Sequence, residues 1–473
     1  MNDSTSPRAF RRVMRGLDIT LFSVCAILVI DQLAASAAIG SSAIFWWVFT
    51  LVLFFIPYAL ISAELGTAYP EEGGIYAWVR RAYGPRWGAR ASWLYWVNVA
   101  LWMPSVYVLF AGMFSQMFLP DMSLWSRIAL GIAMTWLTVY INVVRLDLGK
   151  WVPNIGAVVK AAIMVSIGVG GIMYAARHGF ANSLAPRAMA PTLGAGLAFL
   201  PVIVYNFLGF ELMSGAGEEM RNPRRDVPLA ILVSGLLIAA FYLLATIGML
   251  IALPADQIGL IEGLLDSLHR LFDGFAGGAT FVTLLGIGAL FTFLANMVTW
   301  TLGANRAAAE AAARGDLPAV FGKLHAAHGT PANAAIVTGV VSTIVMIVYG
   351  FIAADTEDLF WTLFAFSSIV FLLPYLLMFA AFTKLRRSDA DRPRPYRVSG
   401  GAIGARLLAL LCSAFILQAI VLFVWVPGQP VDAARVTAII GGVLASIIVG
   451  EILIRRAQRP HTAPPAPDVP ARA

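Results

Sequence analysis

The stretch FLPVIVYNFLGFELMSGAGEEMRNPRRDVPLA, residues 199–230, decides how the rest of the chain is interpreted. It begins as an apolar helix, carries Gly209 and Glu211 partway along, and ends in a run of charged residues before Pro228. Glycine weakens a helix, and a carboxylate at membrane depth is costly unless it is paired or wetted. Secondary transporters use broken helices to offer free backbone groups to a solute. We therefore predict half of a solute site here; the alternative is a small-residue packing notch with Glu211 solvated near the cytoplasmic end.

The composition places the chain in the membrane. Of its 473 residues, 59% are hydrophobic and 12% are charged, whereas soluble proteins carry about 25% charged residues. A spanning helix needs about 20 apolar residues, and the apolar runs between polar breaks number about twelve. We therefore expect an all-α integral membrane protein. The runs predict helices at about 17–38, 43–65, 89–115, 124–144, 150–175, 199–215, 228–252, 277–304, 332–352, 358–383, 402–426 and 433–454.

The distribution of basic residues predicts the topology. Most of the 33 Lys and Arg residues fall on alternate inter-helix segments and on the two tails. The positive-inside rule therefore predicts a multi-pass protein of the cytoplasmic membrane with both termini in the cytoplasm. The same distribution explains the net charge of +7, so we do not expect a nucleic-acid partner.

Two predicted helices contain polar interruptions. The first, about 17–38, carries Asp31 and Gln32, and the sixth carries Gly209 and Glu211. Each opens a five-helix unit of similar length, and an odd number of helices makes the second unit run upside down. We expect a cytoplasmic tail at 1–15, a first five-helix repeat at 16–176, an extracellular loop at 177–194, a second, inverted repeat at 195–384, a basic cytoplasmic loop with helices eleven and twelve at 385–456, and a disordered cytoplasmic tail at 457–473.

Several motifs stand in order within residues 17–390. They are Ala63-Glu64-Leu65-Gly66, Pro70-Glu71-Glu72-Gly73-Gly74-Ile75-Tyr76, Gly209-Phe210-Glu211, and Glu218-Glu219 with Asn222-Pro223-Arg224-Arg225-Asp226-Val227-Pro228. Together they resemble the amino acid–polyamine–organocation (APC) superfamily of transporters. The stretches closest in appearance to its glutamate/γ-aminobutyrate antiporter branch are Glu71-Glu72-Gly73-Gly74 with Ala77-Trp78-Val79, and Gly84-Pro85-Arg86-Trp87-Gly88. The resemblance implies a LeuT-type fold of five plus five inverted helices, with helices one and six unwound around the substrate.

The resemblance also implies a substrate site. In such a fold the α-carboxylate of an amino acid meets N–H groups of the first helix, and its ammonium meets carbonyls of the first and sixth. The sixth-helix contacts then fall on Asn206, Gly209 and Phe210, with Phe210 as an aromatic lid over the substrate.

The first helix departs from the family pattern. The Gly-Ser-Gly that many relatives place at the break is missing, and Ile30, Asp31 and Gln32 stand in its neighbourhood. These residues are our candidates for first-helix substrate contacts. Asp31 either recognises an amine-bearing substrate or is a structural residue paired across the bundle.

Lys160 is the most specific candidate for a functional residue, because it lies inside the apolar run of helix five. Some sodium-independent relatives carry a lysine at the matching place, where its ammonium substitutes for a sodium ion between helices one and five. A desolvated lysine releases its proton more readily than a solvated one, so Lys160 is also a candidate for proton coupling. The alternative is a side chain that snorkels to the cytoplasmic interface. We favour the cation-replacing role.

Two further features bear on specificity and gating. Helix eight carries Asn296 where glutamate/γ-aminobutyrate exchangers place an acidic residue, which weakens the transfer of their specificity. The charged motif after helix six is interpreted as a cytoplasmic gate and packing device. We expect Glu218, Arg221 and Arg225 to pair differently in the inward-open and outward-open states. The gate or structural residues are Glu211, Glu218, Arg221 and Arg225.

The sequence therefore predicts a secondary transporter of amino acids or related amines. We expect alternating access, sodium-independent and proton-coupled, with an obligate amino acid exchanger of the glutamate/γ-aminobutyrate type as the alternative. A channel lacks support because no filter-like backbone repeat occurs. An enzyme lacks support because no His-Glu metal motif, Gly-x-Ser-x-Gly elbow or P-loop occurs. We expect no cofactor and no metal; the expected partners are the small-molecule substrate, protons and the lipid bilayer.

Overall fold

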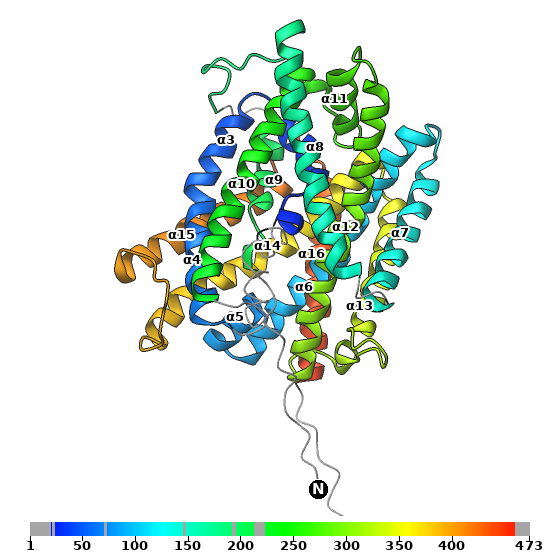
Figure 1. The fold of residues 1–473 in the computed structure, drawn as a ribbon. Coiled ribbons are helices and arrows are strands. Elements are labelled where there is room, and N and C mark those ends of the chain that lie inside the picture. Colours follow the sequence, from blue (N-terminus) through cyan, green and yellow to red (C-terminus); the bar gives the residue numbers. More distant parts are fainter. Residues whose placement is uncertain are drawn as a thin grey trace, which may run out of the picture.

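The computed structural model describes residues 20, 24–70, 73–144, 148–191, 195–211 and 223–458; for residues 31, 148–150, 195–196 and 223–227 it describes the backbone alone. All regular structure in this part of the chain is helical (Figure 1). Ten helices among the described residues are long and apolar enough to cross a membrane. The two remaining predicted spans, the first and the sixth, are the interrupted ones. The chain is thus an all-α, multi-pass membrane protein, as the composition predicts.

The helix bounds follow the predicted apolar runs closely. The first half contains α3 (Ala43–Thr50), the π-helical turn η2 (Leu51–Phe55), α4 (Ile56–Ala68), α5 (Ile75–Tyr83), α6 (Pro85–Phe118), α7 (Leu124–Val144) and α8 (Leu148–His178). The second half contains α10 (Pro223–Ala252), η5 (Ala255–Gln257), α11 (Gly263–Phe272), α12 (Gly278–Ala313), η6 (Ala319–Gly322), α13 (Ala332–Gly350), α14 (Thr356–Ser388), α15 (Gly401–Val424) and α16 (Ala433–Ala457).

The first helix is broken where the polar residues predict. Residues 24–27 are helical, Leu28 and Val29 are not, and the chain resumes as η1 (Ile30–Gln32) and α2 (Leu33–Ala37). We call residues 25–30 the first break. Leu28 still donates its N–H to the carbonyl of Val24 at 2.9 Å. The backbone groups that follow need partners from elsewhere, because a membrane offers them none.

The sixth helix is broken in the same way. It begins as η3 (Ala195–Phe199) and α9 (Leu200–Asn206), and the chain then turns at Gly209 with φ +111°. Only glycine adopts this backbone conformation readily. Phe210 and Glu211 follow in a 3-10 turn. We call residues 206–211 the sixth break.

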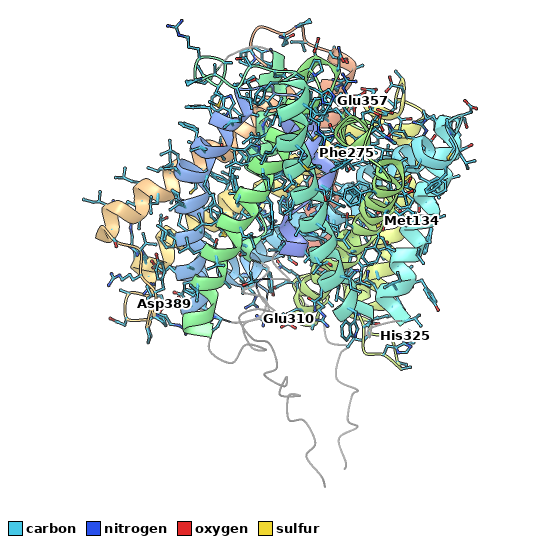
Figure 2. All side chains as sticks on the ribbon, turned by 45° about the horizontal axis from the view of Figure 1, so that its top comes forward. Met134, Phe275, Glu310, His325, Glu357 and Asp389 are labelled. Atoms are coloured by element: carbon cyan, nitrogen blue, oxygen red, sulfur yellow. The ribbon has the colours of Figure 1, made fainter. Side chains whose placement is uncertain are left out.

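Burial separates an inner set of helices from an outer one. In α6, 94% of the most apolar window is buried inside the protein, whereas the corresponding share for α16 is 17%. The inner helices α6, α12 and α14 therefore line the centre, and α15 and α16 lie at the periphery. In Figure 1 the short helix α11 lies at one end of the bundle and α5 at the other. Figure 2 places the charged side chains of Glu310 and Asp389 near the end that carries α5.

One boundary differs substantially from the sequence prediction. Helix eight was expected to end near residue 304, but α12 continues to Ala313. The reason is that the alanine-rich segment 307–313 has high intrinsic helix propensity and extends the span without a break. The predicted tails, apart from residues 457 and 458, lie outside the described residues.

Candidate functional site

Glu211 is buried inside the protein and accepts hydrogen bonds from three tyrosines. Its side chain is buried, with 2% relative exposure for the residue. Tyr58 of α4 donates to Oε2 at 2.5 Å, while Tyr95 of α6 and Tyr375 of α14 donate to Oε1 at 2.9 and 2.8 Å. The Tyr58 hydroxyl also accepts the backbone N–H of Phe210 at 3.1 Å. The alternative of a solvated Glu211 near the bundle end is therefore wrong, because the sixth break folds inward.

This arrangement leaves a buried carboxylate with neutral donors. Among the described residues, Glu211 forms no ion pair. Hydrogen bonds from hydroxyl groups stabilise a buried carboxylate, but they do not neutralise its charge. A cation brought to this place would therefore be attracted strongly, because the surroundings exclude water.

An aromatic cluster adjoins the carboxylate. Its ring centroids lie 5.3–6.2 Å apart along a continuous set of contacts. Tyr95 belongs to this cluster and is also one of the three tyrosines that donate a hydrogen bond to Glu211. Aromatic faces attract cations, most strongly when the site is desolvated. The aromatic cluster consists of Tyr95, Trp102, Tyr205, Trp300 and Phe371.

The sequence prediction missed most of these aromatic residues. A signal for them exists, because Tyr95 and Trp102 are seven residues apart and Phe371 and Tyr375 are four apart. Both spacings place the side chains on one face of a helix. Such spacing is also typical of ordinary packing, so only the convergence of three helices on Glu211 distinguishes this face.

Lys160 of α8 meets the first break. It is buried, and its Nζ donates to the carbonyl of Cys25 at 2.7 Å and to Oδ1 of Asn296 at 3.0 Å. The side chain points into the bundle, so the snorkelling alternative does not hold. Asn296 of α12 thereby accepts from a lysine where it was expected to contact substrate. Lys160 therefore links α8 to the first break and to α12.

Two further side chains bind backbone groups of the first break. Trp300 donates Nε1–H to the carbonyl of Ala26 at 2.7 Å. The hydroxyl of Tyr242 on α10 accepts the N–H of Val29 at 2.8 Å and lies 3.2 and 3.1 Å from the carbonyls of Ile27 and Val29. The first break is thus filled by side chains of the protein itself.

The structure brings some predicted contact residues together and separates others. Asn206 is 1% exposed, and neither polar atom of its amide has a hydrogen-bond partner among the described residues. A Cβ on Gly209 would lie 3.2 Å from atoms of Ile27 and of Trp300, so the two breaks approach closely there. Phe210 instead packs against Phe55, with ring centroids 5.0 Å apart, and is not part of the aromatic cluster.

The other residues predicted for the substrate site and the gate have few described side-chain contacts. Ile30 and Gln32 are buried in η1, and the backbone carbonyl of Gln32 accepts the hydroxyl of Ser36 at 3.0 Å. The side chain of Asp31 and that of Arg225 lie outside the described part, as do Glu218 and Arg221 entirely. No group of three or more His, Cys, Asp or Glu residues that could hold a metal ion occurs among the described residues.

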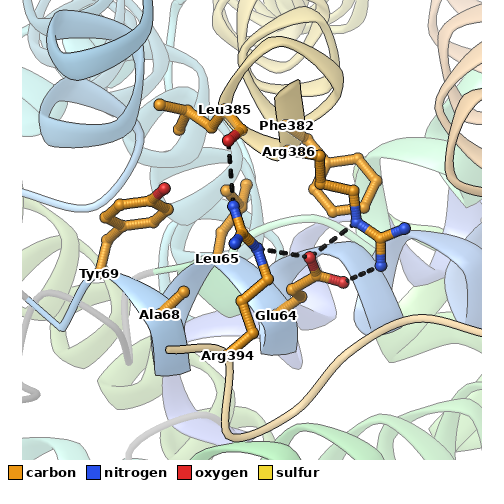
Figure 3. A pocket seen from close by; sticks show the side chains of 8 residues that line it. All are labelled: Glu64, Leu65, Ala68, Tyr69, Phe382, Leu385, Arg386 and Arg394. Carbon is orange, nitrogen blue, oxygen red and sulfur yellow. Dashed lines mark hydrogen bonds and ion pairs between the residues drawn. The ribbon is translucent and has the colours of Figure 1, made fainter. Parts of the chain in front are cut away.

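A second charged centre closes the end of the bundle near α5, and it explains the Glu64 motif. Glu64 of α4 accepts two hydrogen bonds from Arg386, at 2.8 and 2.5 Å, and pairs with Arg394 at 3.2 Å (Figure 3). It also accepts the N–H of Val398 at 2.7 Å. These contacts fasten the loop after α14 to α4. Because their hydrogen bonds are satisfied internally, we assign them a bracing role.

The same loop carries a second, more exposed contact at Asp389. Tyr69 donates to Asp389 at 3.0 Å, and Arg81 donates to the same oxygen at 3.1 Å. Burial alone raises the pKa of Asp389, but these hydrogen bonds outweigh it and hold the pKa below its usual range. Burial and the bond to Asp389 raise the pKa of Tyr69 to about 12. The contact is therefore intact at neutral pH.

Comparison with known proteins identifies the family. Residues 16–445 match the model of the amino acid permease family. The chain is 35% identical over 437 residues to a probable agmatine/putrescine antiporter of Lactococcus lactis, covering 92% of each protein. It is 30% identical over 405 residues to an uncharacterized transporter of Legionella pneumophila, covering 84% of this chain and 86% of the relative. It is 27% identical over 398 residues to the inner membrane transporter YjeM of Salmonella typhimurium, with 75% and 78% covered. With two broken helices around a buried site and these relatives, the chain belongs to the amino acid permease family of the APC superfamily.

Proposed function

We propose that this transporter exchanges cationic amines across the cytoplasmic membrane by alternating access. The observation that carries the proposal is the buried carboxylate of Glu211, which has three tyrosine hydroxyls but no ion pair in the described part of the chain. An anion kept at the centre of a membrane protein favours a cationic solute, because the low dielectric strengthens their attraction.

The aromatic cluster supports the same substrate class. Trp300 contacts the rings of Trp102 and Phe371, and Phe371 contacts Tyr375, whose hydroxyl donates to Glu211. A cation within about 6 Å of an aromatic face gains energy without requiring a second charged residue. We infer that one amine of the substrate approaches Glu211 and that its remainder lies among these rings. Asn206 then supplies hydrogen bonds through its amide, which has no partner among the described residues.

Exchange is favoured over symport by the family comparison. The Lactococcus lactis relative is named as a probable agmatine/putrescine antiporter, and we extend amine exchange from it to this chain. Exchange of glutamate for γ-aminobutyrate is disfavoured here, because an acidic substrate would approach the Glu211 carboxylate. Lys160 remains our candidate for replacing a sodium ion, since its ammonium bridges the first break and Asn296.

Proton coupling is the second candidate mechanism. It is favoured by the same lysine, which is buried and donates to the Cys25 carbonyl at the first break. We further propose that the end bearing α5 faces the cytoplasm, and that residues 16–176 and 195–384 form the two inverted repeats. Glu211 and its tyrosines then act as a gate, because a hydroxyl that leaves the carboxylate frees α4, α6 or α14 to move.

The test is uptake of labelled agmatine and putrescine into proteoliposomes. One set is preloaded with unlabelled amine, and a second, empty set receives an inward proton gradient. We expect uptake into the preloaded vesicles and little into the empty ones. Gradient-driven uptake into empty vesicles would replace exchange with proton symport. Uptake of glutamate in preference to both amines would contradict the proposed substrate class.

A further inference from the structure

We propose that Tyr242 is a specificity-determining residue that closes the first break to carboxylates, so that the transporter accepts amines that lack an α-carboxylate and rejects the amino acids from which they derive. The inference rests on the proposed function and deepens it. It assigns the selection of the substrate class to a side chain of α10, outside both broken helices.

The geometry of the hydroxyl carries the argument. Tyr242 is fully buried, and its hydroxyl accepts the N–H of Val29 at 2.8 Å. Its proton lies within reach of two carbonyls, Ile27 at 3.2 Å and Val29 at 3.1 Å. The hydroxyl therefore acts as acceptor and donor at once, which suits a break that presents both an N–H and C=O groups.

A carboxylate does not reproduce this pattern. When ionised it only accepts hydrogen bonds, so it would satisfy the N–H of Val29 but leave the carbonyl oxygens without a donor. Those carbonyls would also repel its negative charge at short range. An unsatisfied backbone group inside a membrane protein is costly. Replacing the hydroxyl of Tyr242 with a substrate carboxylate is therefore unfavourable.

Two further carbonyls of the first break are also occupied. The carbonyls of Cys25 and Ala26 accept from Lys160 and Trp300. Val29 and Ile30 are β-branched and buried, so their side chains cover the backbone where glycines would expose it. Half-helix ends bind an anionic substrate group through free backbone N–H groups. Here the N–H of Val29 is taken.

Packing holds the tyrosine in this position. Its ring stacks on Trp47 of α3, with centroids 4.6 Å apart and an interplanar angle of 17°. Trp47 in turn contacts Phe207 of the sixth break edge-on at 5.3 Å. Movement of Tyr242 to admit a carboxylate would disturb both breaks, so the hydroxyl is a fixed part of the site.

The experiment compares amines with their carboxylated parents. Vesicles are preloaded with putrescine, and initial uptake of labelled agmatine is measured against arginine, and of putrescine against ornithine. For the wild type we expect each amine to exceed its parent by about 10- to 100-fold, the effect of one lost hydrogen bond to a charged group. Equal uptake of amine and parent would overturn the inference while leaving amine transport intact. Uptake of none of the four compounds would overturn the proposed function, and the inference with it.

The substitution Tyr242→Phe then tests the residue itself. It removes the hydroxyl and keeps the ring, which frees the N–H of Val29, and we expect arginine uptake to rise and the agmatine-to-arginine ratio to fall at least about fivefold. The matched control is Tyr349→Phe, which removes a hydroxyl that donates to the Ala438 carbonyl at 3.1 Å between α13 and α16. A Tyr242→Phe protein that carries agmatine with the wild-type ratio contradicts the proposal. If this variant does not fold, the two wild-type ratios decide.

Discussion

The two breaks are stabilised by opposite charges and by different kinds of hydrogen-bond partner. At the first break, carbonyl groups accept from Lys160 and Trp300, and the hydroxyl of Tyr242 covers an N–H. At the sixth break, an acidic side chain turns inward and Glu211 accepts from hydroxyls on three helices. The first break therefore holds a buried cation against fixed backbone atoms, and the sixth holds a buried anion against side chains.

This difference predicts different roles for the two breaks. Backbone carbonyls move only with their helix, so the lysine pins the first break to α8 and α12. Tyrosine hydroxyls leave a carboxylate by small movements of separate helices, so the sixth break is the place where a cation competes for Glu211. We expect the first break to act as a support and the sixth break to respond to substrate.

The largest effect is expected at the sixth break itself. Glu211→Gln keeps the shape of the side chain but removes the charge, so the attraction for an amine is lost. We expect initial amine uptake to fall at least about 100-fold while the protein stays folded, as a charge interaction worth about 3 kcal/mol implies. The matched control is Glu310→Gln, whose carboxylate pairs with Arg314 on the surface of α12. Uptake close to wild type in Glu211→Gln would remove the carboxylate from the site.

A smaller loss is expected at the first break. Lys160→Ala leaves the carbonyl of Cys25 and the amide of Asn296 without their donor, so the break loses its anchor. We expect transport to fall about tenfold and its dependence on pH to disappear, measured as uptake between pH 5 and 8. Lys384→Ala serves as control, because Lys384 lies over the ring of Tyr83 away from both breaks. A variant with unchanged pH dependence would exclude a coupling role for Lys160.

Trp300 links the two regions and gives a finer test. Trp300→Phe removes the hydrogen bond to the carbonyl of Ala26 and keeps an aromatic ring in the cluster. Because a neutral hydrogen bond contributes about 1 kcal/mol, we expect about a fivefold loss of uptake. Trp93→Phe removes a similar bond, to the Ser446 carbonyl at 2.8 Å, outside both breaks. Equal losses in the two variants would mean that the first break has no special role.

The smallest effect is expected far from both breaks, at Asp266 on α11. Burial raises the pKa of Asp266 above its ordinary value, although the hydrogen bond from Gln116 at 2.7 Å opposes the shift. The folded protein therefore binds this proton at a higher pH than the unfolded chain does, and stability rises as the pH falls through that window. We expect thermal unfolding of Asp266→Asn, measured as the pH falls toward the ordinary range of an aspartate pKa, to lack this rise. An identical pH profile in the variant would show that the carboxyl does not contribute.

The sequence by itself determined the membrane class, the span positions and the two interruptions. These follow from local properties: apolar runs of sufficient length predict the spans, and polar residues or glycine within a run predict a break. Lys160 could also be identified from the sequence, because a charged residue within a long apolar run is rare. The family motifs placed Glu211 near the site, and the comparison with relatives confirmed the superfamily.

Only the tertiary structure decided what surrounds those residues. Tyr58, Tyr95 and Tyr375 lie on three helices that are distant in sequence, and nothing local marks them as partners of one carboxylate. Likewise, Tyr242 lies 213 residues from Val29. Phe210 was expected over the substrate, and only the fold shows that its ring packs against Phe55 of another helix. The physical reason is that buried polar groups must find partners wherever the fold brings them, and those partners are fixed by helix packing.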